Sequence, residues 1–359
     1  MTIRENLIDR IIELSNIQAI SSREERMIDY LKEVFKDTSY TVTVDNIGNI
    51  TAYHPKQEEG KQKVLVFAHI DEIGIIVRKI SEDGFIYIER MGGVTTTIMP
   101  GQHFEFDTPN GFVDGVIGVQ GHHFMDQENK FSVYPIKKMY VDVCASSKQE
   151  VLDMGIDVGT MATFSQKCEL INNKYLRGKA IDNRAAVGIL VELALEMEKK
   201  NPDVNLIFAF PVQEEFNIRG LMPVIRKVKP DIAIGLDITC SCDTPDMDYN
   251  DVKMDGGPAI AYMNFHGGGT LAGVLPNMKL VKDFEETAKE MNIPLQKEIS
   301  PGVITENAFG LFENEEGIKV GNLSIPTRYT HTPFEIASVG DIVQLYNLMH
   351  EMLLKRLKG

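Results

Sequence analysis

The stretch Asn205-Leu-Ile-Phe-Ala-Phe-Pro-Val212, followed directly by Gln213-Glu214-Glu215-Phe216, decides how this chain is expected to fold. Its near-continuous apolar run predicts a strand that is buried on both faces, as in parallel sheets covered by helices. Open α/β sheets bind their ligands beyond the carboxyl ends of such strands. Two adjacent carboxylates at this position therefore indicate a metal ligand beside a general base rather than a solvated loop charge.

Other segments alternate in a way that extends this sheet. Lys63-Val-Leu-Val-Phe-Ala68 is a second buried strand by the same criterion, and apolar residues at helical spacing predict two helices within residues 4–36. Further helices are predicted at residues 184–199, 221–228, 278–291 and 339–357, and further strands at 231–236 and 318–323. This order predicts an α/β fold with a mostly parallel sheet and helices on both faces.

The pattern changes between about residues 72 and 165. Short strand-like runs are separated by turns such as Thr108-Pro-Asn-Gly111, and the one clear helix lies between the cap residue Ser147 and Gly155. A chain of 359 residues is longer than one core usually serves. We therefore expect a discontinuous larger domain, residues 1–71 and 166–359, with a small β-rich domain inserted at 72–165.

Composition excludes several classes of partner. Lys and Arg total 37 against 52 for Asp and Glu, a net charge of −15, which argues against nucleic acid or an anionic membrane as a partner. No apolar run approaches the roughly 18–20 residues of a membrane span. The amino terminus opens into an amphipathic helix rather than a signal peptide, so a cytoplasmic protein is expected.

The cysteines fit that expectation. Cys144, Cys168, Cys240 and Cys242 do not form a disulfide framework in a chain of this length, and Cys-x-Cys lacks the usual zinc-knuckle spacing. Reduced thiols are the simplest interpretation. Because Cys240 and Cys242 follow an aspartate at a strand end, ligation of a metal by their thiolates is the alternative.

More candidate groups lie at the ends of other predicted elements. His69 and Asp71 share one face after the strand at 63–68, where a carboxylate can fix the tautomer of a metal-binding imidazole. Asp182 precedes a helix, Asp237 ends a strand, and His331 lies in a polar loop. Each alone has a plain explanation, such as a helix cap for Asp182 or a solvated loop side chain for His331.

Together these groups predict a metal centre. Two imidazoles and three carboxylates form a hard, oxygen-rich ligand set that suits a pair of divalent cations. One carboxylate can bridge both cations through its two oxygens, and the second glutamate of the pair can then take a proton from a bridging water. Cations about 3.5–4 Å apart are the familiar two-metal arrangement for hydrolysis.

The order of these motifs resembles a known family, the tetrahedral aminopeptidases, which are glutamyl- and deblocking-aminopeptidase-like cocatalytic metallopeptidases. The resemblance runs along nearly the whole chain. It rests on His69-Ile-Asp71-Glu-Ile-Gly74, Asp182-Asn-Arg184, Glu214-Glu215-x-x-x-Arg-Gly220, Asp237-Ile-Thr239 and Arg328-Tyr-x-His331.

The resemblance implies a role for each residue. Asp182 would bridge two divalent ions, zinc in first place and cobalt or manganese as substitutes, with His69 and Asp237 on one ion and Glu215 and His331 on the other. Glu214 would be the general base that activates a water bridging the ions, and Asp71 would orient His69. The implied substrates are peptides, cleaved at the N-terminal residue. The family also implies a zinc-peptidase-like fold, a PDZ-like inserted dimerisation domain and a homo-oligomer, a dodecamer built from dimers.

Some features depart from the family pattern or are set aside. Pro301-Gly-Val-Ile-Thr-Glu-Asn-Ala308 replaces a Gly-Gly-Thr-Asp-Ala stretch, which brings an acid, Glu306, into that region, and Phe216-Asn-Ile218 replaces the common Val-Gly. Gly267-Gly-Gly269 lacks the Lys-Ser/Thr of a phosphate loop, and His122-His123 fits surface or intersubunit packing better than a metal site. Two functions remain as alternatives: a metal-dependent deacylase or glycan hydrolase, and an inactive assembly or binding protein.

Overall fold

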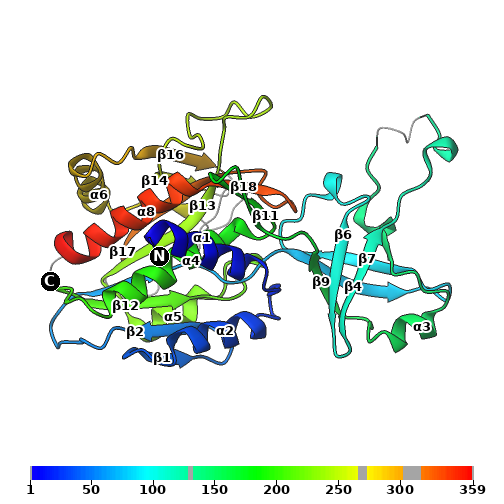
Figure 1. Cartoon of the computed structure of the whole chain (residues 1–359), viewed down its shortest axis with the longest axis horizontal. Coiled ribbons are helices and arrows are strands. Elements are labelled where there is room, and N and C mark those ends of the chain that lie inside the picture. Colours follow the sequence, from blue (N-terminus) through cyan, green and yellow to red (C-terminus); the bar gives the residue numbers. More distant parts are fainter. Residues whose placement is uncertain (1, 128–131, 266–272, 302–316, 358–359) are drawn as a thin grey trace.

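The central sheet is built around the strands that the apolar runs predict. The structure, a computed structural model, describes residues 2–127, 132–265, 273–301 and 317–357. Its largest sheet has the order β1-β2-β12-β3-β13-β17-β18-β11-β10 (Figure 1). The strands on this path are β1 (Thr41–Val44), β2 (Ile50–Tyr53), β3 (Lys63–Phe67), β10 (Glu169–Ile171), β11 (Tyr175–Gly178), β12 (Asn205–Phe210), β13 (Ile232–Cys240), β17 (Lys319–Arg328) and β18 (Glu335–Ser338).

Strand direction differs between the centre and the flanks of this sheet. The central strands β12, β3, β13 and β17 are parallel, whereas β1 and β2 on one flank and β18, β11 and β10 on the other pair antiparallel. The prediction of a mostly parallel sheet is therefore correct only for the centre. Short links such as residues 45–49 and 329–334 reverse the chain without a crossover helix, and a strand that returns this way must pair antiparallel.

Helices cover both faces of the sheet, as the buried runs predict. Along β3, Val64 and Val66 pack into a core shared with α1, α4 and α8, while Leu65 and Phe67 pack with α5 on the opposite face. This alternation follows from the two-residue period of a strand. The helices are α1 (Ile3–Ser15), α2 (Glu25–Phe35), α3 (Lys148–Asp153), α4 (Ile181–Met197), α5 (Leu221–Val228), α6 (Met278–Glu290) and α8 (Val339–Glu351). None of these described helices is long and apolar enough to cross a membrane.

A closed barrel accounts for the β-rich stretch. Its strand order is β4-β5-β8-β7-β6-β9, and it encloses its own apolar core, in which Phe104 packs against Phe164 (Figure 1). The strands are β4 (Gly74–Ile80), β5 (Ile86–Met91), β6 (His103–Thr108), β7 (Gly111–Ile117), β8 (Tyr140–Asp142) and β9 (Met161–Phe164). The domain boundaries, the PDZ likeness and the dimerisation role of this barrel stay predictions.

A small group of strands extends the sheet beside β17. Strand β14 (Ala259–Phe265) pairs with β17, β15 (Gly273–Val274) and β16 (Gln296–Pro301). The segments around Gly267 and Glu306, which the sequence singled out, lie outside the described residues.

The parallel centre brings distant parts of the sequence to one edge of the sheet. Strands that run in one direction end on one side, so the segments after β3, β12 and β17 and the carboxyl half of β13 share that edge. These segments carry His69, Glu214, His331 and Asp237. Helix α4, which holds Asp182 near its start, packs against β13.

Candidate metal centre

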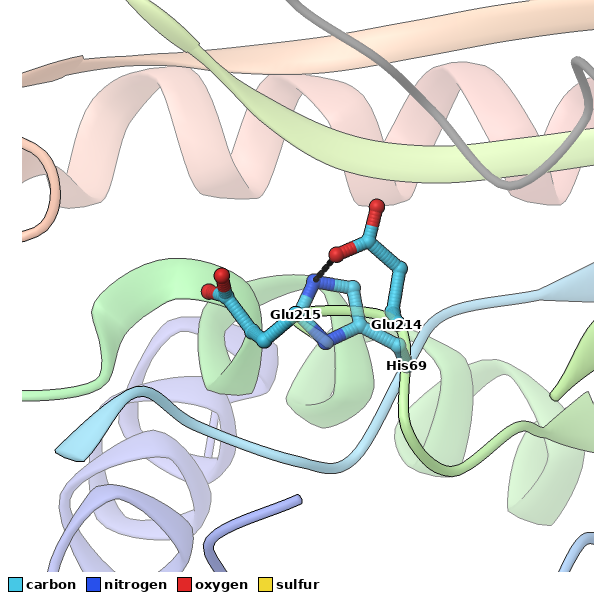
Figure 2. Close-up of side chains that lie close together, drawn as sticks. All are labelled: His69, Glu214 and Glu215. Atoms are coloured by element: carbon cyan, nitrogen blue, oxygen red, sulfur yellow. Dashed lines mark ion pairs between the residues drawn. The ribbon is translucent and has the colours of Figure 1, made fainter. Parts of the chain in front are cut away.

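The side chains that the sequence singled out converge at this edge. Three groups of ligand atoms, each lying within 4.8 Å of one another, occur among the described residues. The groups are His69–Asp182–Asp237, Asp182–Glu215–His331 and His69–Glu214–Glu215. Figure 2 shows His69 between the two glutamates, with an ion pair of 3.9 Å between its Nε2 and Glu214 Oε2.

Asp182 links the two imidazoles. Its Oδ1 lies 3.3 Å from His69 Nε2, and its Oδ2 lies 3.4 Å from His331 Nε2. On the side of His69, Asp237 Oδ1 lies 3.9 Å from the Nε2 of that ring. On the side of His331, Glu215 Oε1 lies 3.4 Å from the Nε2 of that ring. A carboxylate whose two oxygens face different imidazoles has the form of a bridging ligand.

Asp182 lies at a kink near the start of α4. It has non-helical φ and ψ angles inside the first turn of that helix, and such angles are usual at a helix N-cap. The two oxygens of its carboxylate face the imidazoles of His69 and His331, so its side chain belongs to the ligand cluster.

The adjacent glutamates are turned toward the site by a bend that begins before them. Gln213 has φ 58°, and Asn217 and Ile218 after the pair also have positive φ. The bend therefore begins one residue before Glu214 and continues past Phe216.

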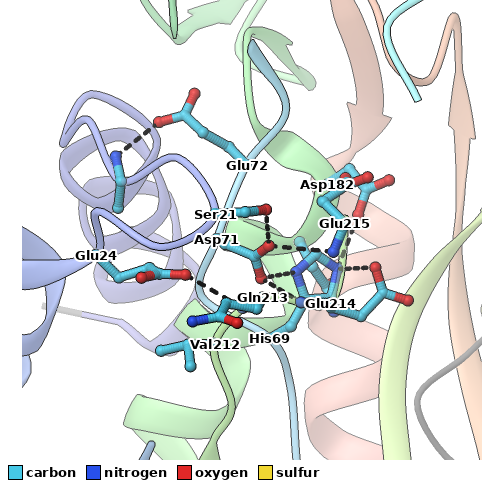
Figure 3. A network of polar contacts seen from close by, with 12 residues as sticks. Ser21, Glu24, His69, Asp71, Glu72, Asp182, Val212, Gln213, Glu214 and Glu215 are labelled. Carbon is cyan, nitrogen blue, oxygen red and sulfur yellow. Dashed lines mark hydrogen bonds and ion pairs between the residues drawn. The ribbon is translucent and has the colours of Figure 1, made fainter. Parts of the chain in front are cut away.

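Asp71 ties His69 to both glutamates (Figure 3). Its Oδ1 accepts the backbone N–H of Glu214 at 2.9 Å, and its Oδ2 accepts that of Glu215 at 3.1 Å and the hydroxyl of Ser21 at 2.5 Å. Oδ1 also lies 3.4 Å from His69 Nδ1, a buried nitrogen with no hydrogen bond of good geometry. Nδ1 thus faces a carboxylate while Nε2 faces the ligand cluster, the usual arrangement around a metal-binding imidazole.

Glu335 is a part of the site that sequence reasoning missed. It lies on β18, is buried, and accepts the backbone N–H of Asp182 at 2.9 Å through Oε2 and that of His331 at 2.8 Å through Oε1. Burial and the charge of Asp182 raise the pKa of Glu335 to about 8. One carboxylate therefore fixes two cluster residues that are far apart in sequence. No local motif signals this, because its two partners are backbone groups.

The barrel also contributes to the site. The carbonyl oxygen of Gly93 lies 3.2 Å from His331 Nδ1, and a Cβ atom at position 93 would lie 2.5 Å from that nitrogen. Gly93 therefore allows the ring to approach the backbone closely.

The charges of the cluster fit bound cations. Burial raises the pKa of Asp237 to about 8 and also raises that of Glu215, and the charge of Asp182 adds to both shifts. Burial opposes protonation of His69 and His331, but the charges of Glu214 and Glu215 outweigh it and raise their pKa values. Divalent cations stabilise the ionised form of crowded, buried acids, because their charge offsets the repulsion between the carboxylates. Imidazole and carboxylate together are also a suitable donor set for such cations.

A cavity of about 720 Å³ opens onto the cluster. Besides the candidate ligands and Glu214, its lining includes Phe216, Ile218, Ile238, Cys240 and Thr330. A space of this size, lined by apolar side chains and convergent polar groups, fits a small organic substrate or the end of a peptide.

The cysteines and the paired histidines lie outside the ligand groups. Burial raises the pKa of Cys240, whose thiol lies 3.4 Å from the Thr330 hydroxyl, so the thiol form is favoured over a thiolate ligand. His122 and His123 are exposed on the barrel side of the molecule. Neither pair belongs to a metal-ligand group among the described residues.

Comparisons with known proteins identify relatives of this chain. A family model for the M42 glutamyl aminopeptidases matches residues 48–348. SgcX of Escherichia coli strain K12, named as a candidate aminopeptidase, is 38% identical over 342 residues, 95% of this chain and 91% of SgcX. The lysyl aminopeptidase of Pyrococcus furiosus is 30% identical over 353 residues, 97% of this chain and 96% of that enzyme.

Solved structures resemble the whole chain. Aminopeptidase APDkam598 from the archaeon Desulfurococcus kamchatkensis has a TM-score of 0.90 at 28% identity, covering 99% of this chain and 96% of its own. The TET1 peptidase of Pyrococcus horikoshii, described as assembling into a tetrahedron or a large octahedral shell, has 0.84 at 26%, covering 97% and 99%. An endoglucanase of Thermotoga maritima has 0.75 at 25%, covering 96% of each chain.

Proposed function

Because this chain belongs to the M42 glutamyl aminopeptidase family, we propose that it is a metal-dependent aminopeptidase that removes N-terminal residues from peptides, with Glu214 as general base. The family that the sequence motifs predict is thereby confirmed. One observation carries the chemical part of the proposal. The two oxygens of Asp182 face two separate histidine–carboxylate sides, with Glu214 adjoining the cluster.

Two divalent cations fit this arrangement, with zinc proposed first and cobalt or manganese as substitutes. His69 and Asp237 would hold one cation, Glu215 and His331 the other, and Asp182 both. When bound, such a pair supplies Lewis acidity that lowers the pKa of water and polarises a carbonyl group.

The remaining chemistry belongs to Glu214. Its carboxylate would take the proton from the attacking water and return it to the amine that leaves, as a general base and then a general acid. Asp71 would keep this carboxylate in place, because it holds the backbone N–H groups of Glu214 and Glu215 and faces the Nδ1 of His69.

A homo-oligomer is part of the proposal. The solved TET1 peptidase is described as assembling into a tetrahedron or a large octahedral shell, and this chain matches it along nearly its whole length. We extend this to a dodecamer built from dimers, in which the barrel, as a PDZ-like domain, supplies dimer contacts.

The likeness to a structure described as an endoglucanase supports one alternative, a glycan hydrolase on the same site. Most glycosidases use one carboxyl group as acid and a second as nucleophile or base, without metal ions. Here Asp182 and Glu215 pair with imidazoles, which favours the metal-dependent reaction. Release of sugar that a chelator does not inhibit would favour the alternative.

Two matched variants test the mechanism. Glu214→Gln should lower hydrolysis of aminoacyl anilides at least about 100-fold, because a positioned general base contributes roughly 10²–10⁴-fold, and should keep the metal content of the wild type. Glu215→Gln, changed in the same way one residue later, should lose metal as measured by elemental analysis. Wild-type turnover in Glu214→Gln would remove Glu214 from the mechanism, and a metal-loaded wild type inert on a broad dipeptide panel would refute the peptidase itself.

A further inference from the structure

A segment outside the residues matched by the family model reaches the catalytic edge. Residues 19–24, the N-terminal strap, lie in the link between α1 and α2 and precede residue 48, where the family match begins. Figure 3 shows Ser21 of the strap beside Asp71 and Glu24 of the strap beside Gln213. The N–H of Ala19 donates to Glu72 at 3.0 Å, and the Ser21 hydroxyl donates to Asp71.

The last residue of the strap, Glu24, contacts the backbone next to the proposed base. Glu24 occupies the N-cap position of α2, yet its side chain makes no capping hydrogen bond to that helix. Instead it is 3% exposed, and its Oε1 accepts the N–H of Ser22 at 2.8 Å and the N–H of Gln213 at 3.1 Å. The carboxyl group is therefore turned away from its own helix and toward the end of β12.

Gln213 is the residue at which the chain bends toward the site. Its φ of 58° lies in the left-handed region, which non-glycine residues adopt mainly where their surroundings hold them there. The successive N–H groups of Gln213, Glu214 and Glu215 each donate to a buried acidic side chain, the first to Glu24 and the next two to Asp71. The strap thus supports the bend immediately before the proposed base.

We propose that Glu24 is a positioning residue for Glu214: its oxygen holds the Gln213 N–H and so fixes the direction in which the Glu214 side chain leaves the strand end. This inference rests on the proposed role of Glu214 as general base. Glu24 is absent from the residues that line the cavity, so it acts through the backbone of Gln213.

The contact between Glu24 and the Gln213 N–H requires an acceptor oxygen at the correct distance rather than a negative charge. Both N–H groups bond to the same oxygen of Glu24, and an uncharged carboxyl or amide oxygen can accept them equally. Burial and the neighbouring charge of Asp71 raise the pKa of Glu24 to about 8, which is consistent with an uncharged group near neutral pH. Glutamine keeps this oxygen in place, whereas aspartate withdraws it by one methylene.

Two variants of the full-length, zinc-loaded protein separate reach from charge. Glu24→Asp should fold, because aspartate is a favoured N-cap residue, and should lower kcat about 10–100-fold, since a displacement of about 1 Å can cost 10²-fold. KM and metal content should stay within about twofold, because a general base acts in the chemical step rather than in binding. Glu24→Gln should stay within about threefold of the wild type. Glu25→Asp, the same change at the exposed neighbour, is the control.

Hydrogen exchange followed by mass spectrometry gives a readout that does not depend on turnover. The amides of residues 213–215 should exchange faster in Glu24→Asp than in the wild type or Glu24→Gln. Wild-type kcat and amide protection in Glu24→Asp would overturn the inference, as would a Glu24→Gln variant as impaired as Glu24→Asp. A wild-type protein without peptidase activity would instead refute the proposed function, and the exchange data would still decide whether Glu24 holds the bend.

Discussion

Replacing Glu335 by glutamine should weaken metal binding although the residue is not a proposed ligand. Its two carboxylate oxygens accept the backbone N–H groups of Asp182 and His331 at 2.9 and 2.8 Å. Glutamine has one oxygen, so its NH₂ group must face one of these N–H donors. Glu335→Gln therefore leaves one buried N–H without a partner at a residue that the metal centre needs.

The size of the expected loss in metal affinity follows from the one acceptor that glutamine lacks. A buried donor left without a partner costs about 1–3 kcal/mol, which corresponds to roughly 5–150-fold in an equilibrium constant at 1.4 kcal/mol per tenfold. Most of the cost should appear in the metal-loaded protein. The loop of His331 is partly exposed, with its side chain 33% accessible, and can relax when no cation holds the ring. We expect metal affinity to fall about 10–100-fold, the usual effect of losing a group that orients metal ligands.

Competition with a chromogenic chelator measures this affinity directly. Urea denaturation of the metal-free protein, run in parallel, shows how much of the cost falls on the fold itself. Glu169→Gln, at an exposed ion pair with Arg177, is the matched control and should leave both quantities unchanged. Zinc affinity within twofold of the wild type in Glu335→Gln would refute the argument that Glu335 holds the two ligands in place.

Two further predictions use the same structure. Gly93→Ala should displace the His331 ring, because a Cβ atom would lie 2.5 Å from its Nδ1, and should lower zinc affinity measured by calorimetry at least about tenfold. Gly340→Ala is the control: a Cβ atom there would lie 3.4 Å from its nearest neighbour and should leave zinc affinity unchanged. Burial raises the pKa of Asp341 from 3.8 to about 6, so its stabilising effect is present below pH 3.8 and is lost as pH rises through about 6. Urea denaturation between pH 4 and pH 7 should show the free energy of unfolding of the wild type falling by up to about 3 kcal/mol relative to that of Asp341→Asn, at 1.36 kcal/mol per pH unit. The same pH dependence in both proteins would contradict this prediction.

The sequence predicts the central strands and the groups at their ends for a physical reason. A strand buried on both faces must be apolar throughout, so a polar residue directly after it marks the strand end, and parallel strands end on one side. This locates His69, Glu214 and Glu215 near one another before any coordinates are known. The prediction that Asp237 ends a strand is wrong, because β13 continues past it to Cys240. The helix at 221–228 was predicted with the bounds that α5 has, because its apolar face repeats at helical spacing.

Pairing direction at the flanks could not be predicted in this way. An apolar strand next to a short link and one next to a crossover helix have the same composition, and only the link length distinguishes them. The sequence indicates a polar loop around His331, but it does not indicate that the short link at 329–334 makes β18 pair antiparallel with β17.

The groups that hold the site in place lie beyond local patterns for a deeper reason. Glu24, Glu335 and Gly93 act through backbone N–H and carbonyl groups of distant segments, and every residue except proline carries both groups. Because any residue can supply such a backbone group, the sequence does not indicate which side chain binds to it. The ligands themselves differ, because imidazole and carboxylate chemistry restricts which residues can serve. A metal centre is therefore predictable from its ligands, whereas the precision of its geometry depends on residues that only the folded chain identifies.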